Sequence, residues 1–91
     1  MFHALVKQVV PEFDKWLVDF ESGVAMRRAA GAMSAVVFRN PGDPHEVLIY
    51  TTWDSEENAV NFAKSPQATD FSEAIGSGIP LFLTESYVFD G

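Results

Sequence analysis

The chain has 91 residues, of which 47% are hydrophobic and 13% aromatic, so it is long enough for one domain with a dense core and too short for two. Its formal net charge of −7 argues against a general nucleic-acid-binding protein, because contacts with phosphates need clustered lysine and arginine. The sequence contains no cysteine, which excludes disulfides, thiolate chemistry and cysteine-based metal sites.

The charged residues are unevenly distributed along the chain. Residues 1–40 carry five bases and four acids, whereas residues 41–91 carry nine acids and a single base, Lys64. Two interpretations stay open. The acids can form an ordinary solvated surface, or the bases Arg27, Arg28 and Arg39 can form a small basic spot that receives an anion.

Neither the first residues nor the apolar runs have the pattern of a targeting or membrane segment. No basic region is followed by a long apolar stretch, as it would be in a signal peptide. No apolar run approaches the roughly 18 residues that a membrane-spanning helix needs. Together with the lack of cysteine, this predicts a cytoplasmic protein with no membrane partner.

The first part of the chain predicts a strand followed by a helix. Residues 2–10 are rich in valine, leucine and alanine, and the proline that follows cannot donate a hydrogen bond to a sheet. From residue 11 or 12 to residue 30, apolar side chains recur at spacings of three and four, which predicts a helix that Gly31 ends. The pair Ser22-Gly23 predicts either a bend or a close approach of another group, because glycine costs about 1 kcal/mol relative to alanine in a helix.

The middle of the chain predicts a β-hairpin. Residues 33–39 and 46–53 are rich in β-branched and aromatic side chains, as strands are. Residues 40–44 contain asparagine, glycine, aspartate and two prolines, a composition typical of a turn. We therefore expect the two strands to pair antiparallel.

The last part of the chain predicts a helix and a strand. Asp54 is expected to cap the helix, with Glu57 completing a capping box. Ser65-Pro66 restarts the helical pattern, which continues to Gly76. Residues 81–89 are expected to form the final strand.

The predicted order β-α-β-β-α-β is that of the ferredoxin-like fold, an α+β class with an antiparallel four-stranded sheet in one domain over residues 1–91. Helices in this fold cover only one face of the sheet. Every predicted strand is apolar on both faces, so the second face also needs a cover. In so short a chain, a second copy of the same protein is the expected partner, which predicts a homodimer.

The known catalytic and cofactor motifs are absent from the sequence. Its two histidines, His3 and His45, are not at a metal-ligand spacing, so we expect neither a metal nor a cofactor. His45 lies in the predicted turn and is expected to be exposed. His3 begins a strand and is expected to be a hydrogen-bonded residue at the end of the sheet.

Aromatic residues and two polar strand residues indicate where a ligand could bind. The many aromatic rings can form core and dimer interface, or they can line a pocket for a flat apolar molecule. Gln8 and Thr52 lie among apolar neighbours in their strands, so each needs a hydrogen-bond partner, which can be a side chain, a water or a ligand. The candidate substrate-binding residues are therefore Gln8, Trp16, Phe20, Tyr50, Thr52 and Trp53.

Short motifs spread over nearly the whole chain resemble one known superfamily. They include Arg27-Arg28-Ala29-Ala30-Gly31, Phe38-Arg39-Asn40, Asp43-Pro44-His45-Glu46-Val47, Trp53-Asp54-Ser55 and Ser65-Pro66. In order and spacing they resemble the dimeric α/β-barrel superfamily, and among its members the small bacterial proteins called cyclase-like or antibiotic biosynthesis monooxygenase-like. The resemblance implies two sheets packed face to face in a homodimer.

The resemblance also implies two possible functions. One is a cofactor-independent monooxygenase, or a cyclase- or isomerase-like enzyme, that acts on a small aromatic or polyketide-type molecule; Gln8 or Thr52 would orient a substrate oxygen and Tyr50 would donate a proton. The other is a non-catalytic homodimer that binds a small ligand. Similar proteins often carry histidines where this chain has Gln8 and Gly23.

Overall fold

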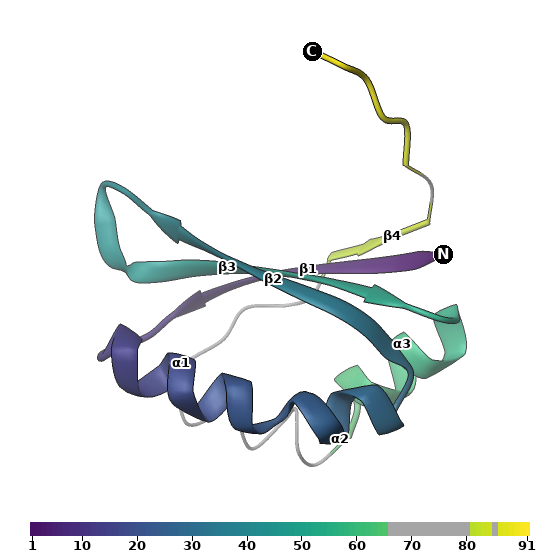
Figure 1. The fold of residues 1–91 in the computed structure, drawn as a ribbon, viewed down its shortest axis with the longest axis horizontal. Helices are drawn as coiled ribbons and strands as arrows, with labels where there is room; N and C mark the ends of the chain where they lie inside the picture. The colour runs from purple at the N-terminus through teal and green to yellow at the C-terminus, as the bar shows by residue number, and fades with distance from the viewer. Residues whose placement is uncertain (66–80, 85) are drawn as a thin grey trace.

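The computed structural model describes residues 1–65, 81–84 and 86–91, and Figure 1 shows their fold. Its helices and strands are β1 (Phe2–Val9), α1 (Phe13–Ser22), α2 (Val24–Ala29), β2 (Ala32–Asn40), β3 (Asp43–Trp53), α3 (Glu56–Ala63) and β4 (Leu81–Leu83). The predicted continuation of the helical pattern from Pro66 to Gly76 lies outside the described residues.

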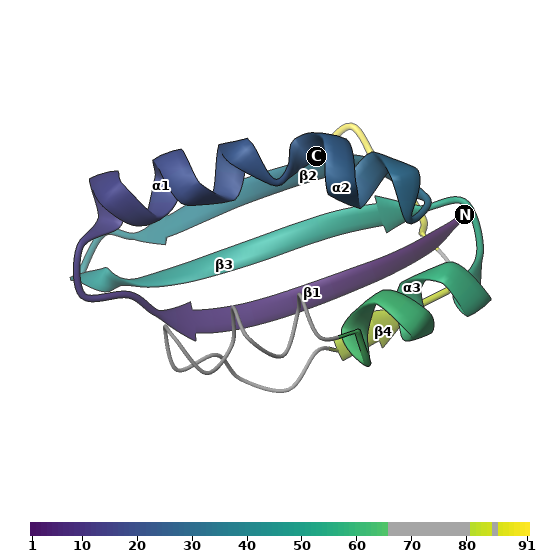
Figure 2. The same cartoon turned by 90° about the horizontal axis from the view of Figure 1, so that it is seen from below.

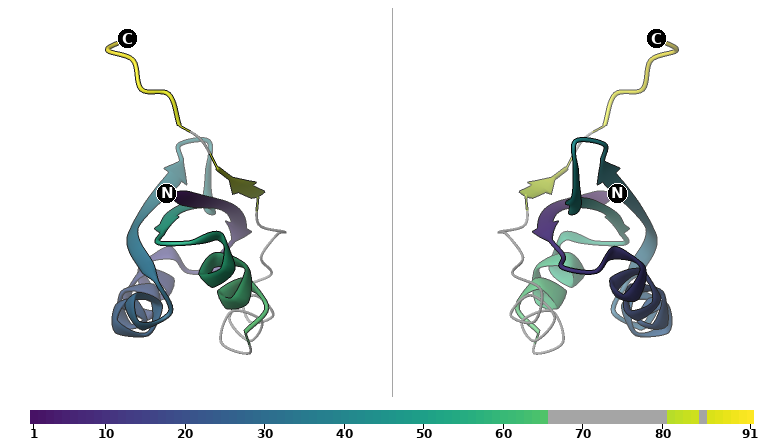
Figure 3. Two further views of the ribbon diagram at one scale, coloured as in Figure 1. Left: turned by 90° about the vertical axis from the view of Figure 1, so that its right-hand side faces the viewer. Right: turned by 90° about the vertical axis from the view of Figure 1, so that its left-hand side faces the viewer.

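The strands form one antiparallel sheet in the order β2-β3-β1-β4, which confirms the α+β ferredoxin-like class. Figures 2 and 3 show α1, α2 and α3 on one side of this sheet, which we call the helix side. The other side is the open face; by register and alternation it carries His3, Leu5, Val36, Tyr50 and Leu81. No helix within the described ranges is long and apolar enough to cross a membrane.

The core lies on the helix side and consists of two clusters of buried side chains. One cluster is next to α3 and contains Phe2, Ala4, Trp53 and Ala59, with Phe62 packed against it. The other is next to α1 and contains Val10, Trp16, Val47 and Ile49, with Phe20 packed against it. Burial of a large apolar side chain stabilises a fold by roughly 1.5–3 kcal/mol, so these clusters hold the helices to the sheet.

The predicted long helix is divided at Gly23 into α1 and α2, which confirms the predicted bend. The Gly23 amide donates to the Phe20 carbonyl over 3.1 Å, the tighter bond of a helix end, and the Arg27 amide donates to the Gly23 carbonyl over 3.0 Å. The helical pattern therefore resumes at once, and α1 and α2 stay on the same side of the sheet (Figure 2).

The chain leaves α2 through Gly31, which has a φ of 110°. This is the left-handed region that glycine enters at low cost and that commonly ends helices. The Gly31 carbonyl accepts a hydrogen bond of 3.0 Å from the Asp54 amide, so the end of α2 is joined to the segment between β3 and α3. A Cβ at position 31 would lie 2.6 Å from Asp54 Oδ1 and 2.7 Å from Asn58 Nδ2.

Helix α3 is capped by Ser55, so the prediction of Asp54 as the cap is wrong by one residue. Ser55 Oγ accepts a hydrogen bond of 3.1 Å from the Asn58 amide. Asp54 instead accepts one of 2.8 Å from the side-chain amide of Asn58 through Oδ1. The bond from the Asp54 amide to Gly31 holds Asp54 outside the helix, which leaves the cap position to the following serine.

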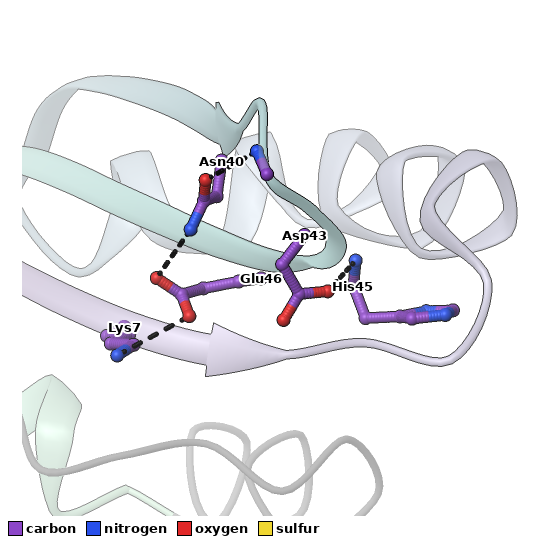
Figure 4. A network of polar contacts seen from close by, with 6 residues as sticks. Lys7, Asn40, Asp43, His45 and Glu46 are labelled. Carbon is purple, nitrogen blue, oxygen red and sulfur yellow. Dashed lines mark hydrogen bonds and ion pairs between the residues drawn. The ribbon is translucent and has the colours of Figure 1, made fainter.

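The β2–β3 hairpin is longer than predicted, because β3 already begins at Asp43 and the turn shrinks to Pro41-Gly42. Polar contacts join the strands at this end of the sheet (Figure 4). Glu46 accepts a hydrogen bond of 3.3 Å from Asn40 and forms an ion pair of 3.4 Å with Lys7. His45 is exposed, as predicted, and its Nδ1 donates to the Val10 carbonyl over 3.0 Å.

The predicted last strand is much shorter in the structure. Only Leu81–Leu83 pair with β1, and residues 84 and 86–91 have no regular secondary structure. This final segment runs away from the rest of the molecule on the side of the open face (Figure 1). Its apolar side chains Val88 and Phe89 are 91% and 80% exposed. A strand that continued beyond Leu83 would need a pairing partner that β1 does not supply there.

Gly31→Ala is expected to lower the free energy of unfolding by about 1–3 kcal/mol, because alanine would be strained at this φ and its Cβ would collide with Asp54 and Asn58. Gly42→Ala is the matched control, since a Cβ there meets only Asn40 Oδ1, at 3.5 Å. Urea denaturation followed by circular dichroism measures both variants. Equal losses in the two would contradict the role assigned to Gly31.

Candidate functional site

The six predicted site residues are divided between the two sides of the sheet. In the β1–β3 register Gln8 pairs with Val47 and Phe2 pairs with Trp53, and all four side chains lie on the helix side. Because side chains alternate along a strand, Tyr50 and Thr52 lie on the open face. Trp16 and Phe20 come from α1 and pack on the helix side. Because side chains alternate along β3, one chain does not bring Gln8, Tyr50, Thr52 and Trp53 together in one pocket.

Gln8 carries a buried side-chain oxygen, Oε1, on the helix side that lacks a hydrogen-bond partner among the described residues. A buried acceptor without a partner costs about 1–3 kcal/mol. The amide oxygen can accept a hydrogen bond from a hydroxyl group of a ligand on this side of the sheet.

The two tryptophans on the helix side are held in different surroundings. Trp53 Nε1 donates to Thr51 Oγ1 over 2.9 Å, and its ring lies 5.2 Å from that of Phe62. Trp16 stacks on Phe20 with ring centroids 5.1 Å apart and an angle of 24° between the planes. Trp53 thus belongs to the cluster near α3, whereas Trp16 and Phe20 form an aromatic wall under α1.

A groove of about 530 Å³ lies between α1, α2 and β2. Of the six predicted residues, Phe20 lines it. Its apolar walls also include Leu17, Val24, Met33 and Val37, and its charged residues are Glu21, Arg27 and Arg28. The groove is large enough for a small organic molecule, and its aromatic and aliphatic lining is typical of such sites.

Arg27 is the buried charge of this groove. Its side chain is 8% exposed, its Nη1 donates to the Phe20 carbonyl over 2.8 Å, and the guanidinium carbon lies 3.8 Å from the centroid of the Phe20 ring. Burial lowers the pKa of Arg27 below its ordinary value, because desolvation disfavours the charged form. The groove therefore holds a cation that has lost much of its hydration.

The basic spot suggested by the sequence is only partly formed. Arg27 and Arg28 line the groove together, but Arg39 does not. The Arg39 guanidinium carbon lies instead 4.1 Å from the centroid of the Phe13 ring. Arg39 lies on β2, after the groove-lining residues of that strand, so the two arginines of α2 are the bases that an anion in the groove would meet.

The open face carries a polar cluster that the sequence analysis did not group. Tyr50 Oη and His3 Nδ1 are 2.7 Å apart, and Thr52 Oγ1 lies 3.4 Å from the same nitrogen. His3 was expected only to be hydrogen bonded at the sheet end, and it is. The cluster depends on the register that pairs His3 with Thr52, which composition does not reveal. A histidine bonded to a tyrosine can exchange a proton with it.

Metal ligands do not gather anywhere in the described ranges: no group of three or more histidine, aspartate or glutamate side chains there could hold an ion. The titratable residues of the groove are Glu21 and the two arginines of α2. The chemistry that the helix side offers is thus hydrogen bonding from Gln8, aromatic contact and a buried positive charge.

The fold is that of several solved structures. One, named an antibiotic biosynthesis monooxygenase, has a TM-score of 0.69 and 15% identity over 97% of this chain and 99% of its own. A variant of SnoaB, a cofactor-independent oxygenase from Streptomyces nogalater, has a TM-score of 0.65 and 13% identity over 99% and 97%. A Mycobacterium tuberculosis protein has a TM-score of 0.67 and 13% identity over 97% and 98%.

At these identities the likeness shows the fold alone. No curated protein sequence matches the chain. The sequence profile of one family, described as antibiotic biosynthesis monooxygenase, matches residues 5–74, which span β1 to α3 and part of the chain beyond. This match covers most of the sequence, and the chain therefore belongs to the antibiotic biosynthesis monooxygenase family.

Proposed function

We propose that this protein is a cofactor-independent monooxygenase that oxidises a small, phenolic, polycyclic aromatic molecule bound on the helix side of its sheet. Family membership supports a monooxygenase, and the fold is shared with the cofactor-independent oxygenase SnoaB. The apolar groove, which is lined by Phe20 with the buried Trp16 stacked on that ring, suits a flat substrate.

The observation that carries the proposal is the buried Oε1 of Gln8, which has no partner among the described residues. Buried polar atoms in folded proteins are nearly always hydrogen bonded, so an exception points to a missing partner. A phenolic hydroxyl donates the bond that this oxygen lacks. Gln8 would then orient the substrate ring on the side of the sheet where the aromatic side chains lie.

Without a cofactor, the electrons for the reduction of dioxygen come from the substrate. A methylene group between two phenolic rings loses both hydrogens. One atom of dioxygen becomes the oxygen of the new ketone, and the other leaves as water with the two hydrogens, so four electrons pass from carbon to oxygen. In this scheme the protein binds and orients the ring and keeps bulk water away from it.

Dithranol, a dihydroxy-anthrone with such a methylene group, is the test substrate. We expect the protein to accelerate dioxygen uptake above the spontaneous rate and to yield the corresponding anthraquinone. Catalase should return no dioxygen, because the second oxygen atom leaves as water and not as hydrogen peroxide. Uptake equal to that of a heat-denatured sample would contradict the proposed reaction.

Gln8→Met is expected to raise the free energy of unfolding by about 1 kcal/mol, since it removes a buried acceptor without a partner among the described residues. The same change should slow dithranol oxidation about tenfold. Thr51→Val is the matched control: it removes the acceptor of Trp53 Nε1 and should lower stability by about 1 kcal/mol. A loss of stability in Gln8→Met would show that Gln8 is structural.

A non-catalytic ligand-binding protein is the second candidate, and one observation favours it. Neither histidine lines the groove: His3 is on the open face, and His45 is exposed at the hairpin. The groove thus lacks the side chain best suited to proton transfer near neutral pH. Tight binding of dithranol without accelerated dioxygen uptake would favour this alternative.

We also propose that two copies pair through their open faces. Val36 and Phe38 on β2 are 46% and 53% exposed there, and Leu81 on β4 is 56% exposed. Several exposed apolar side chains on one face of a sheet mark an interaction site. The final segment, with Val88 and Phe89, projects on the same side and can pair with the sheet of the second copy.

Val36→Glu is expected to convert the dimer to a monomer at micromolar concentration, because it would bury a carboxylate in the apolar interface. Val18→Glu is the control, since Val18 is 66% exposed on α1 and away from the open face. Analytical ultracentrifugation measures both. A wild-type protein that sediments as a monomer at this concentration would refute the dimer.

A further inference from the structure

The groove contains a buried positive charge that forms no ion pair within the described part of the chain. Arg27 is 8% exposed and forms no ion pair with any carboxylate among the described residues. The ion pair that the described residues do form joins Lys7 to Glu46. Burying a cation without a counter-ion is costly. An anionic ligand in the groove would supply the missing counter-ion.

The contacts of Arg27 with α1 use only part of its binding capacity. Its Nη1 donates to the Phe20 carbonyl, which lies where α1 ends, and the guanidinium stacks on the Phe20 ring. A guanidinium has five N–H donors, and the described residues accept a hydrogen bond from Nη1 alone. A neutral side chain would satisfy that carbonyl with less desolvation, so the helix end does not account for the charge.

The other residues of the groove define the ligand. Arg27 and Arg28 carry two positive charges and Glu21 one negative charge, which leaves a net charge of +1 for one anionic group. The remaining walls are mainly aliphatic, with the aromatic side chain of Phe20 among them, so the rest of the ligand should be apolar. A carboxylate matches the planar fork of donors that a guanidinium presents.

We propose that the groove binds an aromatic carboxylate, with the ring against Leu17 and Met33 and the carboxylate hydrogen bonded to Arg27. This inference rests on the proposed function, since it assigns a carboxylate to the substrate that we place on the helix side of the sheet. Gly23 makes the arrangement possible, because a Cβ there would lie 2.8 Å from Arg27 Nη1 and displace the guanidinium.

Two naphthalene probes of nearly equal shape, naphthoate and the neutral naphthamide, test the charge. Isothermal titration calorimetry should show that the wild-type protein binds naphthoate at least about tenfold more tightly. Arg27→Met should remove this preference, Arg27→Lys should restore part of it, and Gly23→Ala should weaken it by moving the guanidinium. Arg39→Met is the matched control and should keep the preference, because Arg39 does not line the groove.

Equal affinities for the two probes, or no binding of naphthoate at millimolar concentration, would overturn the inference. This comparison needs only the wild-type protein, so it decides the question even if Arg27→Met does not fold. Displacement of naphthoate by an equal concentration of inorganic phosphate would contradict the aromatic part of the proposal. The dithranol assay is separate: naphthoate binding without dithranol oxidation would leave this inference standing and refute the oxygenase.

Discussion

Strands β1 and β3 pair in a single antiparallel register, and the alternation of their side chains assigns each residue to one of two faces. Gln8 and Trp53 face the helices, whereas His3, Tyr50 and Thr52 face away from them. A slip of one residue would exchange the two sets. The aromatic groove under α1 and the polar cluster on the open face are thus separate sites whose positions follow from the same pairing.

The helix side combines tightly satisfied polar groups with unsatisfied ones. Trp53, in the apolar cluster near α3, donates its indole N–H to Thr51 Oγ1, so its polar atom is satisfied within the protein. Gln8 and Arg27 are equally buried, yet each keeps hydrogen-bonding capacity that the described residues do not use. Stability alone would favour the replacement of Gln8 and Arg27 by apolar residues. Their unused hydrogen-bonding capacity distinguishes the region around α1 and α2 from an ordinary hydrophobic core.

The sequence predicted the order of elements, the bend at Gly23 and the glycine end of α2, because these depend on local periodicity and backbone conformation. Gln8 lies among apolar neighbours, as the sequence indicated, whereas Thr52 pairs with the polar residues His3 and Ser34. The cap of α3 was missed by one residue, because the bond of Asp54 to Gly31 is a tertiary contact. The contact of His3 with Tyr50 and the groove at Arg27 depend on strand register and helix placement, which no local pattern encodes.

The short distance between Gly23 and the Arg27 guanidinium couples two positions that lie one helical turn apart. A side chain at position 23 and an arginine at position 27 compete for the same volume, so the energetic effects of changing them cannot be additive. A larger residue at 23 would take the place of the guanidinium under α1. At this point, therefore, the start of α2 can present one functional group to the groove, from either position 23 or position 27, but not two groups at once.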